Sequence, residues 1–178
     1  MFKSSSREGG SSVHIMYLIA IAAAKKSIYL EGSYFVPDEI AINELIKAKK
    51  RGVKIQILVP GKYTDSKVVQ QASRETWGQL LQAGVEFYEY QPALFHCKSL
   101  IVDDYFVSIG STNFDERSFK LNDEANLNAL DKNLADEQIR VFEMDKEKSK
   151  KVSFEDWQQR PWWDHIIEKL AALGSSQL

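Results

Sequence analysis

The chain has 178 residues, a length that suits one domain with a complete hydrophobic core. Hydrophobic residues make up 44% and charged residues 27%, which excludes a disordered chain. The net charge of −2 argues against nucleic acid as a partner, because proteins that bind it carry a basic field. One cysteine excludes an intrachain disulfide, and the three histidines lack the spacing of zinc ligands, so neither a metal nor another cofactor is predicted.

Residues 1–12 are rich in Ser and Gly, and we expect a flexible linker or terminus there, followed by one domain over residues 13–178. The apolar run Ile15–Ala24 is about half as long as a membrane-spanning helix. It ends at Lys25 and Lys26 and therefore predicts a helix that packs in a core. No transmembrane segment is expected in the chain.

Hydrophobic periodicity predicts helices and strands that alternate through the first half of the chain. In chain order we expect a helix over 13–26, a strand over 27–31, a helix from about 39 to 50 capped by Asp38, a strand over 53–59, a helix over 66–83 and a strand over 85–90. Apolar strands at 97–102 and 105–110 then form a hairpin at Asp103-Asp104, followed by a strand over 123–130 and helices over 133–147 and 161–173. This order predicts an α/β fold with a mixed β-sheet sandwiched between α-helices.

Polar residues stand at fixed offsets around the predicted hairpin, in the pattern H-x-K-x4-D-x6-G-S-x-N. Side chains two residues apart on a strand share a face, so His96 and Lys98 point the same way, as do Ser111 and Asn113. We therefore expect these four side chains to converge on one pocket at the end of the sheet. Asp103 is a further candidate catalytic residue, although its opposite parity favours a role in shaping the turn.

These residue types suit the transfer of a phosphodiester. Histidine supplies a nucleophile or an acid–base group that works near neutral pH. A catalytic histidine needs an acceptor on its second nitrogen, and Glu124, on a following strand, is the candidate for His96. The candidate catalytic residues are thus His96, Lys98, Asp103 and Glu124, and the candidate phosphate-binding residues are Lys98, Ser111 and Asn113.

The motif resembles the HKD signature of the phospholipase D superfamily, and the wider chain resembles the C-terminal half of the bacterial cardiolipin synthases of that superfamily. The resemblance runs from about residue 13 to the end of the chain. Besides the motif, it is carried by Tyr34-Phe-Val-Pro-Asp38, by Arg51-Gly-Val-Lys-Ile-Gln-Ile-Leu-Val-Pro60 and by the stretch from Gly110 to Leu127.

The resemblance implies a two-step reaction without a metal. One histidine attacks the phosphodiester and forms a phosphohistidine, and a second histidine protonates the leaving alcohol and then activates the acceptor. His96 would be one of this pair, and in a C-terminal copy it would usually be the acid–base partner. In a cardiolipin synthase a phosphatidyl group passes between two phosphatidylglycerol molecules and glycerol is released. The implied partner is anionic phospholipid, and the implied location is the bacterial cell membrane on its cytoplasmic side.

The family's synthases carry two HKD motifs, whereas this sequence contains one. Three explanations stay open: the chain is part of a longer enzyme, it forms a homodimer in which two copies of His96 meet, or it pairs with a separately encoded half. Two other functions also stay open. A homodimeric phosphodiesterase, phospholipase D or nuclease would use the same site with water as acceptor, and an inactive half would need a partner HKD domain.

Four features outside the motif have both a functional and a structural interpretation. Segment 34–38 could line a pocket mouth, or end a strand and cap a helix. The loop around Asp65 could touch substrate, although a solvated loop is favoured. Glu31 could be another pocket acid, although a surface position is favoured. The aromatic segment with Trp162 and Trp163 could make peripheral membrane contact or pack on the sheet.

Overall fold

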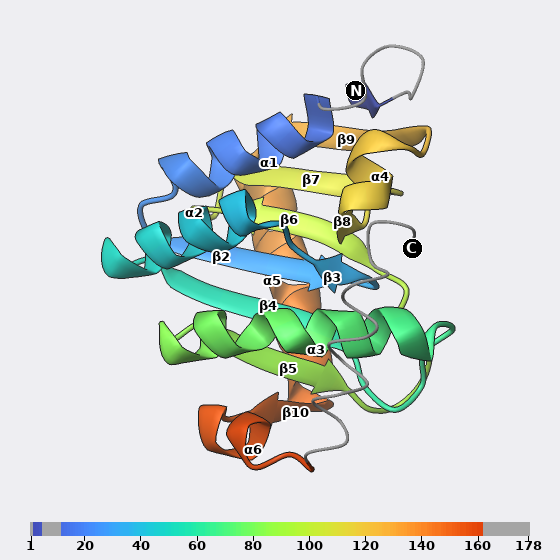
Figure 1. The fold of residues 1–178 in the computed structure, drawn as a ribbon. Coiled ribbons are helices and arrows are strands. Elements are labelled where there is room, and N and C mark those ends of the chain that lie inside the picture. Colours follow the sequence, from blue (N-terminus) through green and yellow to red (C-terminus); the bar gives the residue numbers. More distant parts are fainter. Residues whose placement is uncertain (1, 5–11, 162–178) are drawn as a thin grey trace.

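The computed structural model describes residues 2–4 and 12–161, and Figure 1 shows their arrangement. An eight-stranded sheet runs in the order β1-β9-β7-β6-β2-β4-β5-β10. Three long helices cover one face of this sheet and a fourth crosses the other: α1 (Ser12–Ala23), α2 (Glu39–Lys50) and α3 (Lys67–Gln82), and opposite them α5 (Lys132–Glu147). The predicted α/β fold with a mixed sheet between helices is therefore confirmed.

Three central strands are parallel, and the others join the sheet in the antiparallel sense. The parallel strands are β2 (Ser27–Gly32), β4 (Lys54–Pro60) and β5 (Glu86–Tyr90). The antiparallel strands are β1 (Phe2–Ser4), β6 (Lys98–Val102), β7 (Phe106–Gly110), β9 (Glu124–Leu130) and β10 (Ser149–Val152). Parallel neighbours need crossovers, which α2 and α3 supply, whereas β6 and β7 meet through a tight turn.

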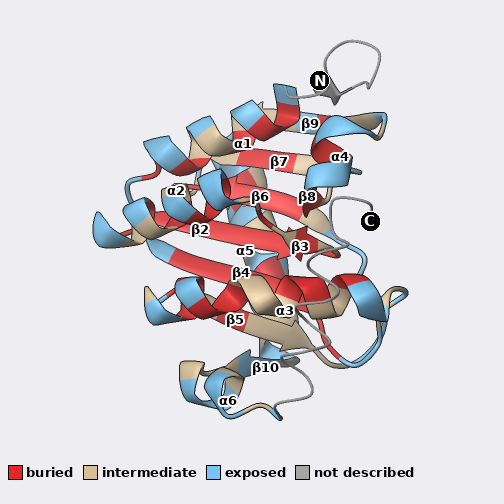
Figure 2. Cartoon of the chain, in the orientation of Figure 1, coloured by how far each residue is buried: buried red, intermediate tan, exposed pale blue. Residues whose placement is uncertain are grey.

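The sheet is buried on both faces, which Figure 2 shows as continuous buried strands in its centre. Every residue of β2 is buried, because alternate side chains meet a helical layer on each side. Ile28 and Leu30 pack in the core beneath α1 and α2, and Tyr29 packs in the core beneath α5, where its ring meets Phe142. This double burial explains why the central strands read as apolar runs in the sequence.

Short elements complete the fold and carry parts of the site. Strand β3 (Phe35–Val36) pairs in parallel with β8 (Phe114–Asp115), which leads into α4 (Glu116–Lys120). A last short helix, α6 (Phe154–Gln158), follows β10.

The structure differs from the sequence expectation at the N-terminal end of the chain. Within the segment 1–12, expected to be a linker, Phe2–Ser4 instead forms β1 and pairs with β9. The expected helix over 161–173, with Trp162 and Trp163, lies outside the described residues. Among the helices that the structure describes, none is long and apolar enough to cross a membrane.

Candidate active site

The motif residues gather at one end of the sheet. His96 lies just before β6, Lys98 opens that strand, Ser111 follows the last residue of β7, and Glu124 opens β9. Antiparallel pairing of β6 with β7 and of β7 with β9 brings these strand ends together. Residues far apart in the sequence therefore reach one surface of the protein.

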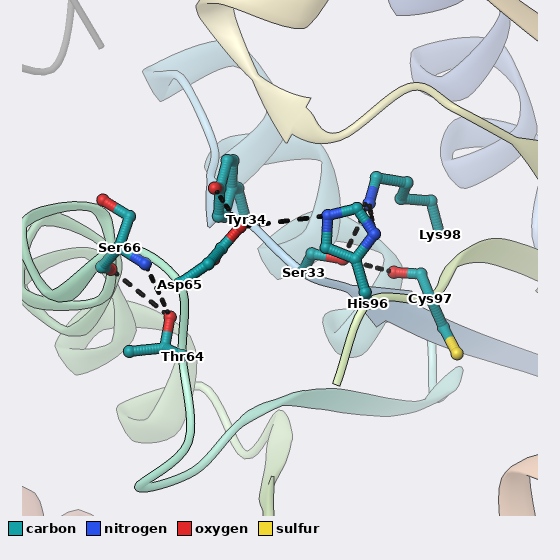
Figure 3. Close-up of polar contacts among 8 residues, drawn as sticks. All are labelled: Ser33, Tyr34, Thr64, Asp65, Ser66, His96, Cys97 and Lys98. Carbon is teal, nitrogen blue, oxygen red and sulfur yellow. Dashed lines mark hydrogen bonds and ion pairs between the residues drawn. The ribbon is translucent and has the colours of Figure 1, made fainter. Parts of the chain in front are cut away.

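Lys98 is fixed beside the ring of His96, as Figure 3 shows. Its ammonium donates to the Ser33 hydroxyl at 2.8 Å and lies 3.2 Å from Nδ1 and 3.3 Å from Nε2 of His96. The Ser33 hydroxyl in turn donates to the Cys97 carbonyl at 3.1 Å. Burial lowers the pKa of Lys98 below its usual value, and nearby carboxylates, Asp65 first among them, oppose that shift. The site thus presents a held cation and an exposed imidazole at one point.

The carboxylate that faces His96 belongs to Asp65, in the loop between β4 and α3. Its Oδ2 lies 4.0 Å from His96 Nε2 and accepts a hydrogen bond from the Tyr34 hydroxyl at 2.8 Å (Figure 3). Burial, together with the hydrogen bond to Asp65, raises the pKa of Tyr34 to about 12. The phenol therefore stays protonated near neutral pH and holds the Asp65 carboxylate in place. The sequence favours a solvated loop for these residues, whereas the structure places the Asp65 carboxylate beside His96.

Glu124, predicted to orient His96, is engaged elsewhere in the structure. Its Oε2 accepts from the Ser111 hydroxyl, and its Oε1 accepts from the Asn122 amide at 3.3 Å. Within residues 12–161, no hydrogen bond or ion pair joins Glu124 to His96. The Ser111 residue lies across from Ala125, the neighbour of Glu124, and its hydroxyl takes up the Glu124 carboxylate instead.

Asp103 lies at the far end of β6, roughly 20 Å along the strand from His96. Its carboxylate accepts the backbone N–H groups of Lys25, Lys26 and Ser27 at 2.6–3.1 Å. Asp103 and Asp104 have φ values of 55° and 56°, the left-handed pair that a type I′ hairpin turn requires. Asp103 therefore anchors the connection from α1 to β2, and we propose this structural role for it in place of a catalytic one.

Asn113, predicted to bind phosphate, lines a cavity of about 200 Å³ beside the motif. The cavity has a mostly polar lining: Tyr34, Ser66, Asn113, Asp115, Arg117, Ser118 and Asn122, with Val69. The Asn113 Oδ1 atom is buried and has no hydrogen-bond partner among the described residues. Tyr34 borders this cavity and also binds Asp65, so the cavity and the His96 surface are neighbours.

Two flanking features are settled by the structure. Segment 34–38 has both expected roles, because Tyr34 reaches the site while Asp38 caps α2 by accepting the Ala41 N–H at 2.9 Å. Glu31, expected at the surface, is instead buried beneath α5, where Ser99 donates to its Oε2 at 2.7 Å. Burial raises the pKa of the Glu31 carboxyl. Since β6 alternates, Ser99 and Lys98 lie on opposite faces, and Glu31 lies on the face away from Lys98.

The fold and this arrangement define a half-domain of the phospholipase D type. A phospholipase D family member, Nuc, from Salmonella typhimurium superposes with a TM-score of 0.74 at 24% identity, over 85% of this chain and 97% of that one. Phosphatidylserine synthase from Haemophilus influenzae superposes with a TM-score of 0.76 at 12% identity, over 96% of this chain and 46% of that one. These likenesses establish the fold.

Residues 17–146 match the model of the cardiolipin synthase, PLD-like domain, and the chain belongs to that family. It is 41% identical over 159 residues to cardiolipin synthase 1 of Staphylococcus epidermidis, covering 89% of this chain and 32% of that protein. It is 37% identical over 163 residues to a cardiolipin synthase of Geobacillus kaustophilus, with 92% and 32% coverage. The resemblance drawn from the motif and its flanks is confirmed. The chain spans about a third of the length of these relatives.

Proposed function

We propose that the chain is a catalytic half of a phosphatidyltransferase that moves a phosphatidyl group between two phosphatidylglycerol molecules and releases glycerol. The observation that carries the proposal is the contact of the Lys98 ammonium with His96 at 3.2 Å, in a chain of the cardiolipin synthase family. A fixed cation beside an exposed imidazole supplies both charge for phosphoryl oxygens and a group that forms a bond to phosphorus or moves a proton.

The reaction has two balanced steps. First, a histidine nitrogen bonds to phosphorus while the bond from phosphorus to the glycerol oxygen breaks, and a second histidine gives that oxygen its proton. Then the acceptor hydroxyl returns a proton to the second histidine, its oxygen bonds to phosphorus, and the nitrogen–phosphorus bond breaks. His96 would act as the acid–base histidine, with Lys98, Ser111 and Asn113 on the phosphoryl oxygens.

In the two-histidine reaction that the family resemblance implies, the second histidine would come from another HKD motif. His14 does not provide it, because its ring is buried between helices, stacks on Phe119 at 4.5 Å and lies 3.3 Å from Asp38. A second copy of this chain or another part of a longer protein would bring the partner motif. We further propose that the complete enzyme works at the cytoplasmic side of the bacterial membrane, on anionic phospholipid and through peripheral contact.

The product profile tests this proposal. The chain is incubated with phosphatidylglycerol vesicles, both alone and with the first-motif half of a cardiolipin synthase, while sedimentation reports the assembly formed. Cardiolipin and glycerol should appear in equal amounts. Phosphatidic acid without cardiolipin would instead assign water as the acceptor and contradict the transferase.

A further inference from the structure

We propose that Asp65 binds the secondary hydroxyl of a glycerol head group, so that the Asp65–Tyr34 pair selects a vicinal diol as the reacting alcohol. The inference rests on the proposed function with His96 as the acid–base histidine. Asp65 would recognise the alcohol, whereas Lys98, Ser111 and Asn113 would bind the phosphate.

The spacing of His96 and Asp65 is the first support. The 4.0 Å between Nε2 and Oδ2 is too long for a direct hydrogen bond. Both side chains are open to solvent, with 57% of His96 and 40% of Asp65 exposed, so a ligand can reach both. Two neighbouring hydroxyls of a diol lie about one hydrogen-bond length apart. One hydroxyl can therefore sit on His96 while the next donates to Asp65.

The fixed position of the Asp65 carboxylate is the second support. The Tyr34 hydroxyl occupies one side of Oδ2, and Oδ1 has no protein partner among the described residues. The loop is held on either side of Asp65, since the Ser66 N–H donates to Thr64 Oγ1 at 3.3 Å (Figure 3). Ser66 Oγ also accepts the Val69 N–H at the start of α3. A carboxylate oxygen that is already positioned and unoccupied is a strong acceptor for a ligand hydroxyl.

The chemistry of glycerol explains why one acceptor would serve both reaction steps. In phosphatidylglycerol the secondary hydroxyl is next to the oxygen bonded to phosphorus and also next to the free primary hydroxyl. When the head group leaves, the oxygen that receives a proton from His96 has this hydroxyl as its neighbour. When a second molecule attacks through its primary hydroxyl, the same hydroxyl again lies beside the reacting oxygen. Asp65 would thus recognise the leaving and the attacking alcohol by one contact.

A matched pair of ligands tests the inference by binding to the whole chain, with no need for turnover. Glycerol 3-phosphate and 1-propyl phosphate share the phosphate and the three-carbon chain, but propyl phosphate lacks both free hydroxyls. NMR titration should show that the unchanged chain binds glycerol 3-phosphate about tenfold more tightly, the effect of one hydrogen bond to a charged group. Asp65→Ala should remove this preference without weakening the binding of propyl phosphate.

Further variants sharpen the test. Asp65→Asn, which keeps the shape of the side chain, should reduce the preference, and Tyr34→Phe should reduce it less. Asp136→Ala is the matched control, because Asp136 is an exposed aspartate of α5 that pairs with Lys132. It should leave both Kd values as they are.

Three results would overturn the inference. The first is equal Kd values for the two ligands in the unchanged chain, and the second is an undiminished preference for glycerol 3-phosphate in Asp65→Ala. The third is an equal loss of affinity for both ligands in Asp65→Ala, which would mean that Asp65 maintains the structure of the whole site. If the unchanged chain binds neither ester, the phosphate site fails and the proposed function falls together with the inference. Binding of propyl phosphate without any preference rejects the inference alone.

Discussion

The Lys98 ammonium lies within 3.3 Å of both ring nitrogens of His96, so a cation and an imidazole meet at one point of the protein surface. A phosphodiester that binds here can place its non-bridging oxygens on the Lys98 ammonium while His96 contacts the ester oxygen. Phosphate binding and proton transfer are therefore linked at this pair, and Lys98 should be as sensitive to substitution as His96.

Lys98→Gln should weaken binding of inorganic phosphate by about tenfold or more, because it removes a charge-assisted hydrogen bond. Burial lowers the pKa of Lys98. A lysine is charged below its pKa, so phosphate affinity should fall as the pH rises through this lowered pKa, earlier than for an exposed lysine. Lys98→Arg, which stays charged, should retain affinity to higher pH. Phosphate titrations from neutral to alkaline pH check this, and identical pH profiles for lysine and arginine would contradict it.

Asp103→Ala should act on stability and leave the chemistry intact. Three backbone N–H groups lose their acceptor, and the free energy of unfolding should fall by about 2–4 kcal/mol. Urea denaturation measures the loss, with Asp136→Ala as the exposed aspartate control. Phosphate affinity of the folded variant should equal that of the unchanged chain. Lost affinity with full stability would return Asp103 to the active site.

Glu31→Gln should raise stability at neutral pH. Because burial raises the pKa of Glu31, the folded state favours the protonated acid, and stability declines as the pH rises from the unfolded pKa through the folded pKa. Glutamine keeps an acceptor for the Ser99 hydroxyl without the charge. Thermal unfolding across this pH range should show a decline for the unchanged chain and a flatter curve for the variant. Parallel curves of stability against pH for the two chains would contradict a raised pKa of Glu31 in the folded state.

Gly110→Ala should destabilise the sheet beside the site. A Cβ at Gly110 would collide with the Ala125 carbonyl and the Asn126 side chain of β9, and Asn126 also binds Tyr17 and Ser108. We expect a loss of about 2 kcal/mol or more. At Gly52 a Cβ would meet no atom, and the φ of +91° alone should cost about 1 kcal/mol. Chemical denaturation of the two variants compares the cost of the collision with the cost of backbone strain. Equal losses in the free energy of unfolding would contradict the close pairing of β7 with β9.

The main elements of the fold were predictable because their periodicity is local. Strand β10 was missed, since Lys150 and Lys151 are typical of a solvated helix end. This strand pairs with β5, and the Lys151 ammonium donates a hydrogen bond to the Glu86 carboxylate at 2.7 Å. No local sequence pattern contains this contact between distant residues. The burial of Glu31 was missed for a related reason, because it depends on α5 packing against that face of the sheet.

The site was predictable where strand alternation decides it and not where loops do. Alternation placed His96 with Lys98 on one side and gave Asp103 the opposite parity. The contact of Asp65 with Tyr34 joins two loops through tertiary packing, so no local pattern in the sequence points to Asp65, whereas Glu124 follows the motif on a predicted strand. One signal was available: Asp65 lies in the loop that follows the buried strand β4, which ends at the same edge of the sheet as β2.

The proposed acid–base role of His96 is tested most directly by the phosphatidyl transfer rate of His96→Gln in the assembly that forms cardiolipin. The variant keeps a polar side chain of similar size at an exposed position, so the fold should be unaffected. The rate of cardiolipin formation should fall by about a thousandfold or more, because the acid–base group is removed. A His96→Gln chain that retains a rate within about tenfold of the unchanged chain would contradict this role.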